Sequence, residues 1–543
     1  MTDRDLHAGR WLGATILVGV ILRVWGLWFG LPHAQARPDE VEAVSYALKI
    51  AQGDLNPHFF NWPSLHLYIL AFIFRASMIV GGLPGPAGAT PTFEHLVPLG
   101  RAYVAVAGVL TIPVLFLLAR RAAGPLAAVG AAALLAVAPL HVRDSHFATT
   151  DVTMTLLVTA SLWLIVEAHV RLERALPAPG APDRGRGVFV MAAAGFVGGL
   201  AAGTKYSAAA ILAAAAVSPL ALAAATRSWR RASTWTPFLA FLASGAAGFV
   251  IATPYAVLDS AAFRADLLFE FAHLAGGHGP DLGRGWVRHL VFSLPHGLGP
   301  AAFVAGCAGF AVALVRGGTP LRMVIAFVAA VYLTIGSGFT VFARYALPLV
   351  PAGCLLAALA VESTSRLLGR VALVFPVLLA VVAAPSLVNS VWLDVLLART
   401  DTRVLAARWL SERLPPDSTV FESGREYVRL DIASPRLHRW RYDPATGHFA
   451  GATADMLPAW LVLHRSPLAE YTPVPETVDA LARRSYVPVR EFAGTTDGVD
   501  PGAYDQQDAF FLPLAGFRHV WRPGPTTTVY ARRDLGAAGA RGP

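Results

Sequence analysis

The sequence predicts a mainly α-helical protein that crosses a membrane many times and carries a small α/β domain at its C-terminus. Hydrophobic residues make up 55% of the 543 residues and charged residues only 15%, whereas about a quarter of the residues of a soluble globular protein are charged. Apolar runs long enough to cross a bilayer recur over residues 1–395. After residue 395 the composition becomes mixed, polar and rich in proline.

Candidate spans come first, because a transmembrane helix needs about 20 apolar residues. The twelve candidates are 11–31, 64–83, 98–119, 124–140, 152–168, 188–204, 207–225, 236–254, 297–315, 321–340, 344–361 and 370–389. Arginine clusters separate these segments in pairs, and basic clusters of this kind are typical of cytoplasmic loops. If all the clusters and the N-terminus are cytoplasmic, one of the first three candidates cannot cross the membrane.

Segment 64–83 is the candidate that we expect not to cross, because it follows Pro63 and contains His66 and Arg75. It has the character of a helix lying in the membrane interface. Eleven spans then remain, with a cytoplasmic N-terminus and an extracytoplasmic C-terminal domain. In the alternative topology, segment 64–83 crosses the membrane and the loop that follows it, residues 84–98, contains a further irregularity in the pattern of crossings.

This topology organises the chain into two domains. The transmembrane domain, residues 1–395, presents three polar outer loops at 32–97, 141–151 and 255–295. An extracytoplasmic α/β domain follows over 396–535, with a helix expected over 403–414 and strands over 418–421 and 526–530. Residues 536–543 are expected to form a loose tail.

Asp39 and Glu40 form an acidic pair in the first outer loop, just after the first apolar segment. Acidic side chains at the edge of a membrane helix carry a cost in free energy unless they are solvated or paired, and otherwise they usually mark a functional site. In the structural interpretation, Asp39 caps a helix over 41–51 and Glu40 faces water. In the functional interpretation, a carboxylate that faces a hydroxyl acts as a general base.

The second outer loop concentrates polar side chains between two strongly apolar segments. It contains His141, Arg143, Asp144, His146 and Asp151. Asp151 also suits the start of the following helix as a cap. A purely structural turn does not need so many ionisable groups, so two acidic loops on one face indicate a site for a hydroxyl or a divalent ion.

Two cations lie where apolar segments end on the same face. Lys205 precedes Tyr206, and Arg344 precedes Tyr345. Either cation could simply extend its charged end into the interface. Together they suit a phosphate at the membrane surface, because arginine offers a planar fork of donors and lysine a point charge.

Several classes of function are excluded or disfavoured by the composition. The formal net charge is +9, but the basic residues gather in short loops, so we expect no nucleic-acid partner. Cys307 and Cys354 lie within apolar segments and form no disulfide framework. The pattern instead favours an enzyme that uses a phosphate-linked lipid donor. A transporter or flippase of lipid-linked sugars and a scaffold for envelope assembly are the alternatives.

The residues around the acidic pair resemble a known family. Pro38-Asp39-Glu40 is similar to the Asp-Glu signature of the GT-C glycosyltransferases of family 39, which include protein O-mannosyltransferases and aminoarabinose lipid A transferases. The later patches that resemble this family, in the same order, are 61–65, Arg101, 143–151, 203–206 and 344–348. The likeness extends over about residues 10–360.

This resemblance implies a GT-C-like fold and an inverting transfer of a sugar from a polyprenyl-phosphate donor to an acceptor protein or to an envelope glycan or lipid. The reaction would occur on the outer face of the bacterial inner membrane. Asp39 would be the base, Asp151 its partner from the second loop, and Lys205 and Arg344 the ligands of the carrier phosphate.

The remaining substrate-binding residues follow from the same resemblance. They would be Glu40, Arg101, Arg143, Asp144, His146, Tyr206 and Tyr345. A divalent cation, Mg²⁺ or Mn²⁺, held by Glu40 and Asp151 is left open. Some relatives have an acid or a lysine just before the 61–65 stretch, and this chain has Phe60-Asn61-Trp62 there.

Overall fold

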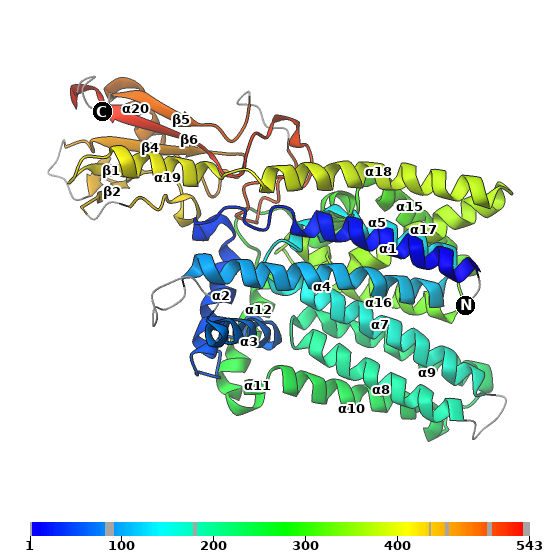
Figure 1. The fold of residues 1–543 in the computed structure, drawn as a ribbon. Coiled ribbons are helices and arrows are strands. Elements are labelled where there is room, and N and C mark those ends of the chain that lie inside the picture. The colour runs from blue at the N-terminus through cyan, green and yellow to red at the C-terminus, as the bar shows by residue number, and fades with distance from the viewer. Residues whose placement is uncertain are drawn as a thin grey trace. The chain divides into compact units, whose positions relative to one another are not determined.

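Helices dominate the computed structural model, which describes residues 3–81, 92–176, 182–433, 436–450, 456–496 and 502–535 (Figure 1). The chain divides into two units. The first, here called the membrane unit, comprises residues 1–25 and 42–391, and the second, the sheet unit, comprises 26–41 and 392–543. The expected tail over 536–543 lies outside the described residues.

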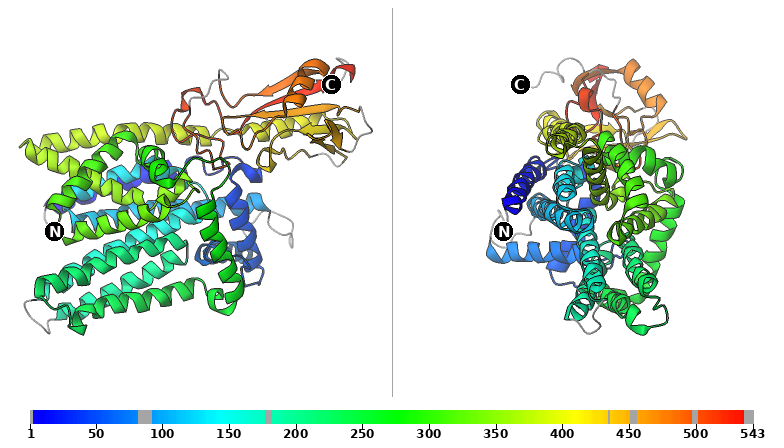
Figure 2. Two further views of the ribbon diagram at one scale, coloured as in Figure 1. Left: turned by 180° about the vertical axis from the view of Figure 1, so that it is seen from behind. Right: turned by 90° about the vertical axis from the view of Figure 1, so that its right-hand side faces the viewer.

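The long helices of the membrane unit run in one common direction as a bundle (Figures 1 and 2). They are α1 (Asp3–Val24), α4 (Phe93–Ala122), α5 (Pro125–Ala136), α7 (Thr150–Arg174), α8 (Pro182–Ala202), α9 (Ile211–Thr226), α10 (Ala232–Ala252), α15 (Pro300–Arg316), α16 (Thr319–Gly336), α17 (Leu349–Leu367) and α18 (Val371–Leu397). Within the described residues, seven helices are long and apolar enough to span a membrane, or eight if one bent pair counts as a single span. The protein is thus a multi-pass membrane protein.

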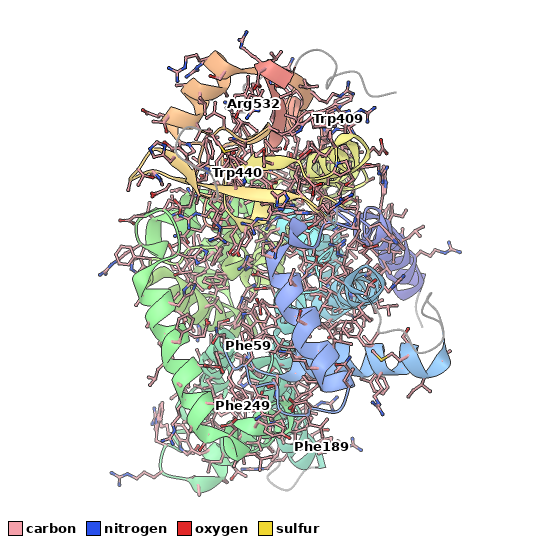
Figure 3. The ribbon with its side chains drawn as sticks, turned by 90° about the vertical axis from the view of Figure 1, so that its left-hand side faces the viewer. Phe59, Phe189, Phe249, Trp409, Trp440 and Arg532 are labelled. Atoms are coloured by element: carbon pink, nitrogen blue, oxygen red, sulfur yellow. The ribbon has the colours of Figure 1, made fainter. Side chains whose placement is uncertain are left out.

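Short helices connect the bundle at its ends. They are α2 (Pro38–Ala51), α3 (Leu65–Val80), α6 (Pro139–Asp144), α11 (Tyr255–Leu258), α12 (Ser260–Gly276), α13 (Gly285–Arg288) and α14 (Leu294–Leu298), with the irregular turns η1 (Ala34–Ala36), η2 (Tyr206–Ala210), η3 (His289–Ser293) and η4 (Ala343–Ala346). Helices α3 and α12 lie across the direction of the bundle (Figures 1 and 3). This orientation suits α3, the expected interfacial helix, because such a helix lies in the membrane plane.

Glycines allow α8 and α10 to pack with their backbones in close contact. A Cβ atom added at Gly199 of α8 would lie 2.1 Å from the carbonyl oxygen of Gly245 in α10, and one added at Gly195 would lie 2.2 Å from that of Phe241. Membrane helices pack by van der Waals contact rather than by a hydrophobic driving force, so small residues are favoured where backbones approach. These glycines therefore fix the spacing of two spans.

A buried arginine stabilises the break in the bundle that precedes the second polar loop. Arg23 of α1 donates to the carbonyl oxygens of Leu135 and Ala136 at 3.0 Å each, at the end of α5. It also lies 3.0 Å from Nδ1 of His141 in α6. The last carbonyls of a helix have no partner within the helix. The guanidinium satisfies them and allows the chain to turn into the loop that carries Asp151.

The sheet unit contains a mixed sheet of six strands. They are β1 (Thr419–Glu422), β2 (His438–Asp443), β3 (His448–Ala450), β4 (Trp460–Arg465), β5 (Tyr486–Phe492) and β6 (Thr526–Arg532), in the order β3-β2-β1-β4-β6-β5. Strands β2, β1 and β4 pair in parallel and the other pairs are antiparallel. The expected helix over 403–414 and the two expected strands are confirmed.

Helices cover both faces of this sheet, so its central strands are buried on both sides. Helix α19 (Thr402–Arg413) packs Ala406 and Leu410 against Val462 and Val529 on one face. On the other face, α20 (Glu476–Ser485) packs Val478 and Ala482 against Leu461 and Leu463. The short turns of this unit are η5 (Glu426–Val428), η6 (Phe517–His519) and η7 (Arg533–Leu535).

Candidate functional site

The predicted site residues fall into two groups, one in each unit. Asp39 and Glu40 belong to the sheet unit, while Asp151, Lys205 and Arg344 belong to the membrane unit.

The acidic pair occupies the first turn of α2, which begins at Pro38. Proline suits the first helical position, and carboxylates are favoured near the positive end of the helix dipole. The side chain of Asp39 is 27% exposed, whereas Glu40 is completely buried. The structural interpretation, in which Glu40 faces water, is therefore wrong, and Asp39 is the accessible member of the pair; the role of Glu40 in substrate binding stays a prediction.

Arg37 lies between two carboxylates of the sheet unit. Its side chain is completely buried, and its Nη2 atom lies 3.6 Å from Oδ2 of Asp39. Its Nη1 atom donates to Asp508, which is also buried. The guanidinium lies 5.7 Å from the centre of the Phe510 ring. Sequence reasoning missed both Arg37 and Asp508, although Arg37 is next to the signature and could have been noticed there.

Further contacts hold the segment 26–41 within the sheet unit. Nδ1 of His33 lies 2.9 Å from Oδ2 of Asp431, and this hydrogen bond lowers the pKa of the Asp431 carboxyl. Arg403 donates to the carbonyl oxygen of Gln35 at 3.3 Å and to that of Tyr427 at 2.7 Å. The acidic pair is thus carried by a segment with several anchors in the C-terminal part of the chain.

In the membrane unit, Lys205 pairs directly with Asp151. The Nζ atom of Lys205 lies 2.6 Å from Oδ1 of Asp151, and the two side chains are 18% and 4% exposed. Asp151 is in the first turn of α7, and Lys205 immediately precedes η2. The ammonium also lies 4.9 Å from the centre of the Tyr345 ring. Residues that are far apart in the sequence therefore meet at the end of the bundle.

Arg344 lies beside the same tyrosine, in η4. Its guanidinium is buried and lies 4.0 Å from the centre of the Phe342 ring, which in turn contacts Tyr345 at 5.4 Å. His278 lies 5.0 Å from Phe342 and 5.4 Å from His273, measured between ring centres. Burial, together with the neighbouring charges of His278 and Arg344, lowers the pKa of His273. These groups form a row of rings and cations that leads to Lys205.

Helix α12 supplies an acid that sequence reasoning missed. Burial raises the pKa of Glu270, while the charge of Lys205 opposes this effect and Asp266 adds to it. The spacing of Asp266 and Glu270, one helical turn apart, was the available signal. These two acids bring negative charge from α12 to the surroundings of Lys205.

The loop before α3 is tied to α12 and η2 by hydrogen bonds. The backbone N–H of Phe60 donates to Oδ2 of Asp266 at 2.7 Å. Tyr206 donates its hydroxyl proton to the carbonyl oxygen of Phe60 at 2.6 Å. Asn56 donates to Asp259 at 2.9 Å. Figure 3 views the face on which α12 lies, with the neighbouring Phe59 labelled. Tyr206 therefore holds this loop close to Lys205.

The other predicted residues of the second loop are buried inside the membrane unit. Arg143 lies 3.4 Å from Asp144, and both are almost completely buried. The ring nitrogens of His146 lie 2.9 Å from the carbonyl oxygen of Val142 and 3.0 Å from that of Trp25. Burial lowers the pKa of His146 to about 4. These contacts stabilise the loop, and a role in substrate binding for them stays a prediction.

Arg101 also lies inside the membrane unit, in α4, and is 1% exposed. Its charge acts on His146 and contributes to the lowered pKa of that histidine. Arg101 is therefore close to the second loop, and its expected role in substrate binding stays a prediction as well.

No ready-made metal centre is formed by the described residues. Among them, no group of three or more His, Cys, Asp or Glu side chains could hold a metal ion. Oδ1 of Asp151 contacts the ammonium of Lys205. A divalent cation held by Glu40 and Asp151 stays a prediction.

The chain is similar to known proteins in part of its sequence and in its fold. Residues 99–257 match the family model described as dolichyl-phosphate-mannose-protein mannosyltransferase. No curated protein matches the chain. Two solved structures of ArnT from Cupriavidus metallidurans match over almost the whole length of both chains at 16% sequence identity. The apo state has a TM-score of 0.53 and covers 99% of this chain and 100% of ArnT. The state bound to undecaprenyl phosphate has a TM-score of 0.52, with 100% of each chain covered.

The chain has the fold of ArnT. The archaeal oligosaccharyltransferase AglB from Archaeoglobus fulgidus, in complex with an inhibitory peptide and a dolichol-phosphate, is also similar, with a TM-score of 0.51 and 16% identity. That match covers 76% of this chain and 59% of AglB, so the chain spans about three fifths of the length of AglB. The GT-C-like fold expected from the sequence is thereby confirmed.

Proposed function

We propose that the protein is an inverting glycosyltransferase. It moves a sugar from a polyprenyl-phosphate donor to an acceptor, a protein or an envelope glycan or lipid, on the non-cytoplasmic face of the bacterial inner membrane. The observation that carries this proposal is the meeting of Lys205, Tyr345 and Arg344 at one end of the bundle. The fold is shared with structures solved with undecaprenyl phosphate and with dolichol-phosphate.

Lys205 and Arg344 are assigned to the phosphate of the donor. Before the donor binds, Asp151 holds the ammonium of Lys205 in place at 2.6 Å. The phosphate then shares this ammonium with Asp151 and takes the fork of Arg344 as a second ligand. As the bond between sugar and phosphate breaks, negative charge grows on the departing phosphate. Fixed cations in a poorly hydrated site stabilise that charge most strongly, and this lowers the barrier.

Asp39 is assigned the role of general base. Its carboxylate removes the proton from the acceptor nucleophile while the nucleophile attacks the anomeric carbon of the sugar. A new bond forms to the acceptor, the bond to the phosphate oxygen breaks, and the electron pair leaves with the polyprenyl phosphate. Attack from the face opposite the phosphate inverts the configuration. Asp39 suits this role better than Glu40, because Asp39 is partly exposed and Glu40 is buried.

The decisive experiment measures release of free polyprenyl phosphate by the purified, reconstituted protein in the presence of acceptor. A transferase releases it, whereas a transporter or flippase returns the intact donor. We expect Asp39→Asn to abolish release while membrane insertion stays normal. The control is Asp417→Asn, since Asp417 is an exposed acid of the sheet unit that lies beside Arg436. Normal release by Asp39→Asn would refute the assignment of the base.

The acceptor requires a separate experiment, because a hydroxyl or an amine on a protein, a lipid or a glycan presents similar chemistry to one carboxylate. Glycolipids and glycoproteins of a deletion strain would be compared with those of the wild type by mass spectrometry. The class of molecule that loses a sugar identifies the acceptor, and the mass difference identifies the sugar.

A further inference from the structure

The sheet unit includes the segment that carries the proposed base. Residues 26–41 group with residues 392–543 and not with the long helices on either side of them in the sequence. The anchors come from three separate parts of the C-terminal region: Asp431 binds His33, Arg403 binds the backbone of Gln35, and Asp508 binds Arg37. A passive C-terminal domain would not need to hold this short segment at three points.

We propose that the sheet unit takes part in the reaction, with Asp508 and Arg37 as positioning residues that set the place and the charge environment of Asp39. This inference rests on the proposed role of Asp39 as the base. It assigns to the C-terminal domain a function that its sequence does not suggest.

The charge balance around Arg37 gives the physical reason. The guanidinium is fully buried and has Asp39 on one side, at 3.6 Å, and Asp508 on the other, in closer contact. A buried cation demands a counter-charge, because the cost of removing it from water is large. Asp508 meets that demand. Asp508 therefore fixes the position of the guanidinium, whose Nη2 atom lies 3.6 Å from Oδ2 of Asp39.

The loop that carries Asp508 is itself firmly held. The hydroxyl of Tyr471 donates to the carbonyl oxygen of Gln507 at 2.6 Å. Tyr504 and Phe511, at the two ends of the loop, pack into one hydrophobic cluster with Val428. Phe510 contacts Phe29 of the base-bearing segment edge to face, with ring centres 5.6 Å apart. A functional side chain is positioned most accurately when the residues that contact it are themselves fixed by packing and hydrogen bonds. The loop that carries Asp508 is fixed in this way.

The test compares variants of the full-length protein in the polyprenyl phosphate release assay. Asp508→Asn should lower kcat by about 10- to 100-fold, the range found when a group that orients a metal-binding side chain is removed. The KM for the donor should not change, because the phosphate ligands Lys205 and Arg344 are untouched. Asp508→Glu, which keeps the carboxylate, should recover most of the rate. Asp417→Asn is the matched control and should behave as wild type.

A double-mutant cycle separates positioning from simple loss of structure. Arg37→Gln removes the cation, so adding Asp508→Asn to it should lower kcat little further, and the two effects should be clearly non-additive. The proposal is overturned if Asp508→Asn keeps the wild-type kcat, if it changes only the KM, or if Asp508→Glu is as slow as Asp508→Asn. Additive effects in the cycle would overturn it too. A wild-type protein that releases no polyprenyl phosphate would instead refute the proposed function itself.

Discussion

The ion pair between Lys205 and Asp151 gives a prediction that tests stability and donor binding separately. Lys205→Met keeps a long unbranched side chain and removes the ammonium that lies 2.6 Å from Oδ1 of Asp151. The carboxylate, only 4% exposed, then loses this counter-charge. Removing one partner of a buried ion pair costs roughly 3–5 kcal/mol. Because the side chain of Lys205 is 18% exposed, water reaches the pair, and we expect the lower end, about 3 kcal/mol.

The same substitution should weaken binding of the carrier lipid. A hydrogen bond to a charged group contributes roughly 1.5–3 kcal/mol, so the Kd for polyprenyl phosphate should rise by about 10- to 150-fold. The double variant Lys205→Met/Asp151→Asn has neither charge. It should recover most of the lost stability, because no unpaired carboxylate remains, and it should still bind the lipid weakly.

Two measurements on the purified protein in detergent check this prediction. Thermal unfolding reports stability, and titration with polyprenyl phosphate, followed by intrinsic tryptophan fluorescence or calorimetry, reports affinity. Lys49→Met is the control, since Lys49 is an exposed lysine at the end of α2. Wild-type affinity in Lys205→Met would refute the assignment of the phosphate ligand. A double variant as unstable as the single one would refute the electrostatic reasoning.

Two further predictions concern packing and pH. Gly199→Ala should lower the melting temperature, because its Cβ would lie 2.1 Å from a backbone oxygen of α10 and overpacking of this kind costs about 1–3 kcal/mol. Gly185→Ala in the same helix is the control and should leave the melting temperature unchanged, since no atom lies within 4 Å of its added Cβ. Equal effects of the two substitutions would contradict the close packing of α8 and α10. Glu270→Gln should be more stable than wild type at neutral pH, because burial raises the pKa of Glu270 above 4.5 and ionising the carboxyl then disfavours the folded state. The sign follows from linkage: the stability associated with the protonated carboxyl is complete below the unfolded pKa and is lost as the pH rises through the raised value. Thermal unfolding of both proteins as a function of pH checks this, and a difference that persists unchanged below pH 4.5 would contradict it.

The helices could be predicted from the sequence because length and apolarity are local properties. All twelve apolar segments contain a helix, including 64–83, whose helix α3 has only 16 residues. The number that crosses is harder to predict. Helix α5 has 12 residues and α15 joins α14 at an angle of 114°, so apolar composition alone does not define a straight span.

The site was predictable where charge appears in an apolar context. Asp151 was visible because it lies in a short polar loop between two apolar segments, and Lys205 because it lies where apolar segments end; the structure joins them. Asp508 could not be found in this way, since it lies in a polar loop whose sequence resembles many others. Its importance depends on a contact with Arg37 across most of the length of the chain, and no periodicity or local spacing encodes such a contact.

The anchoring of residues 26–41 also has a consequence for biosynthesis. The segment with Asp39 is made early by the ribosome, but Asp431, Arg403 and Asp508, which hold it, follow several hundred residues later. A nascent chain that has inserted only its first helices therefore lacks these contacts to the segment that carries Asp39. On the proposed role of Asp39 as the base, we expect sugar transfer to begin only after the C-terminal part of the chain has folded, which would couple the onset of activity to completion of the polypeptide.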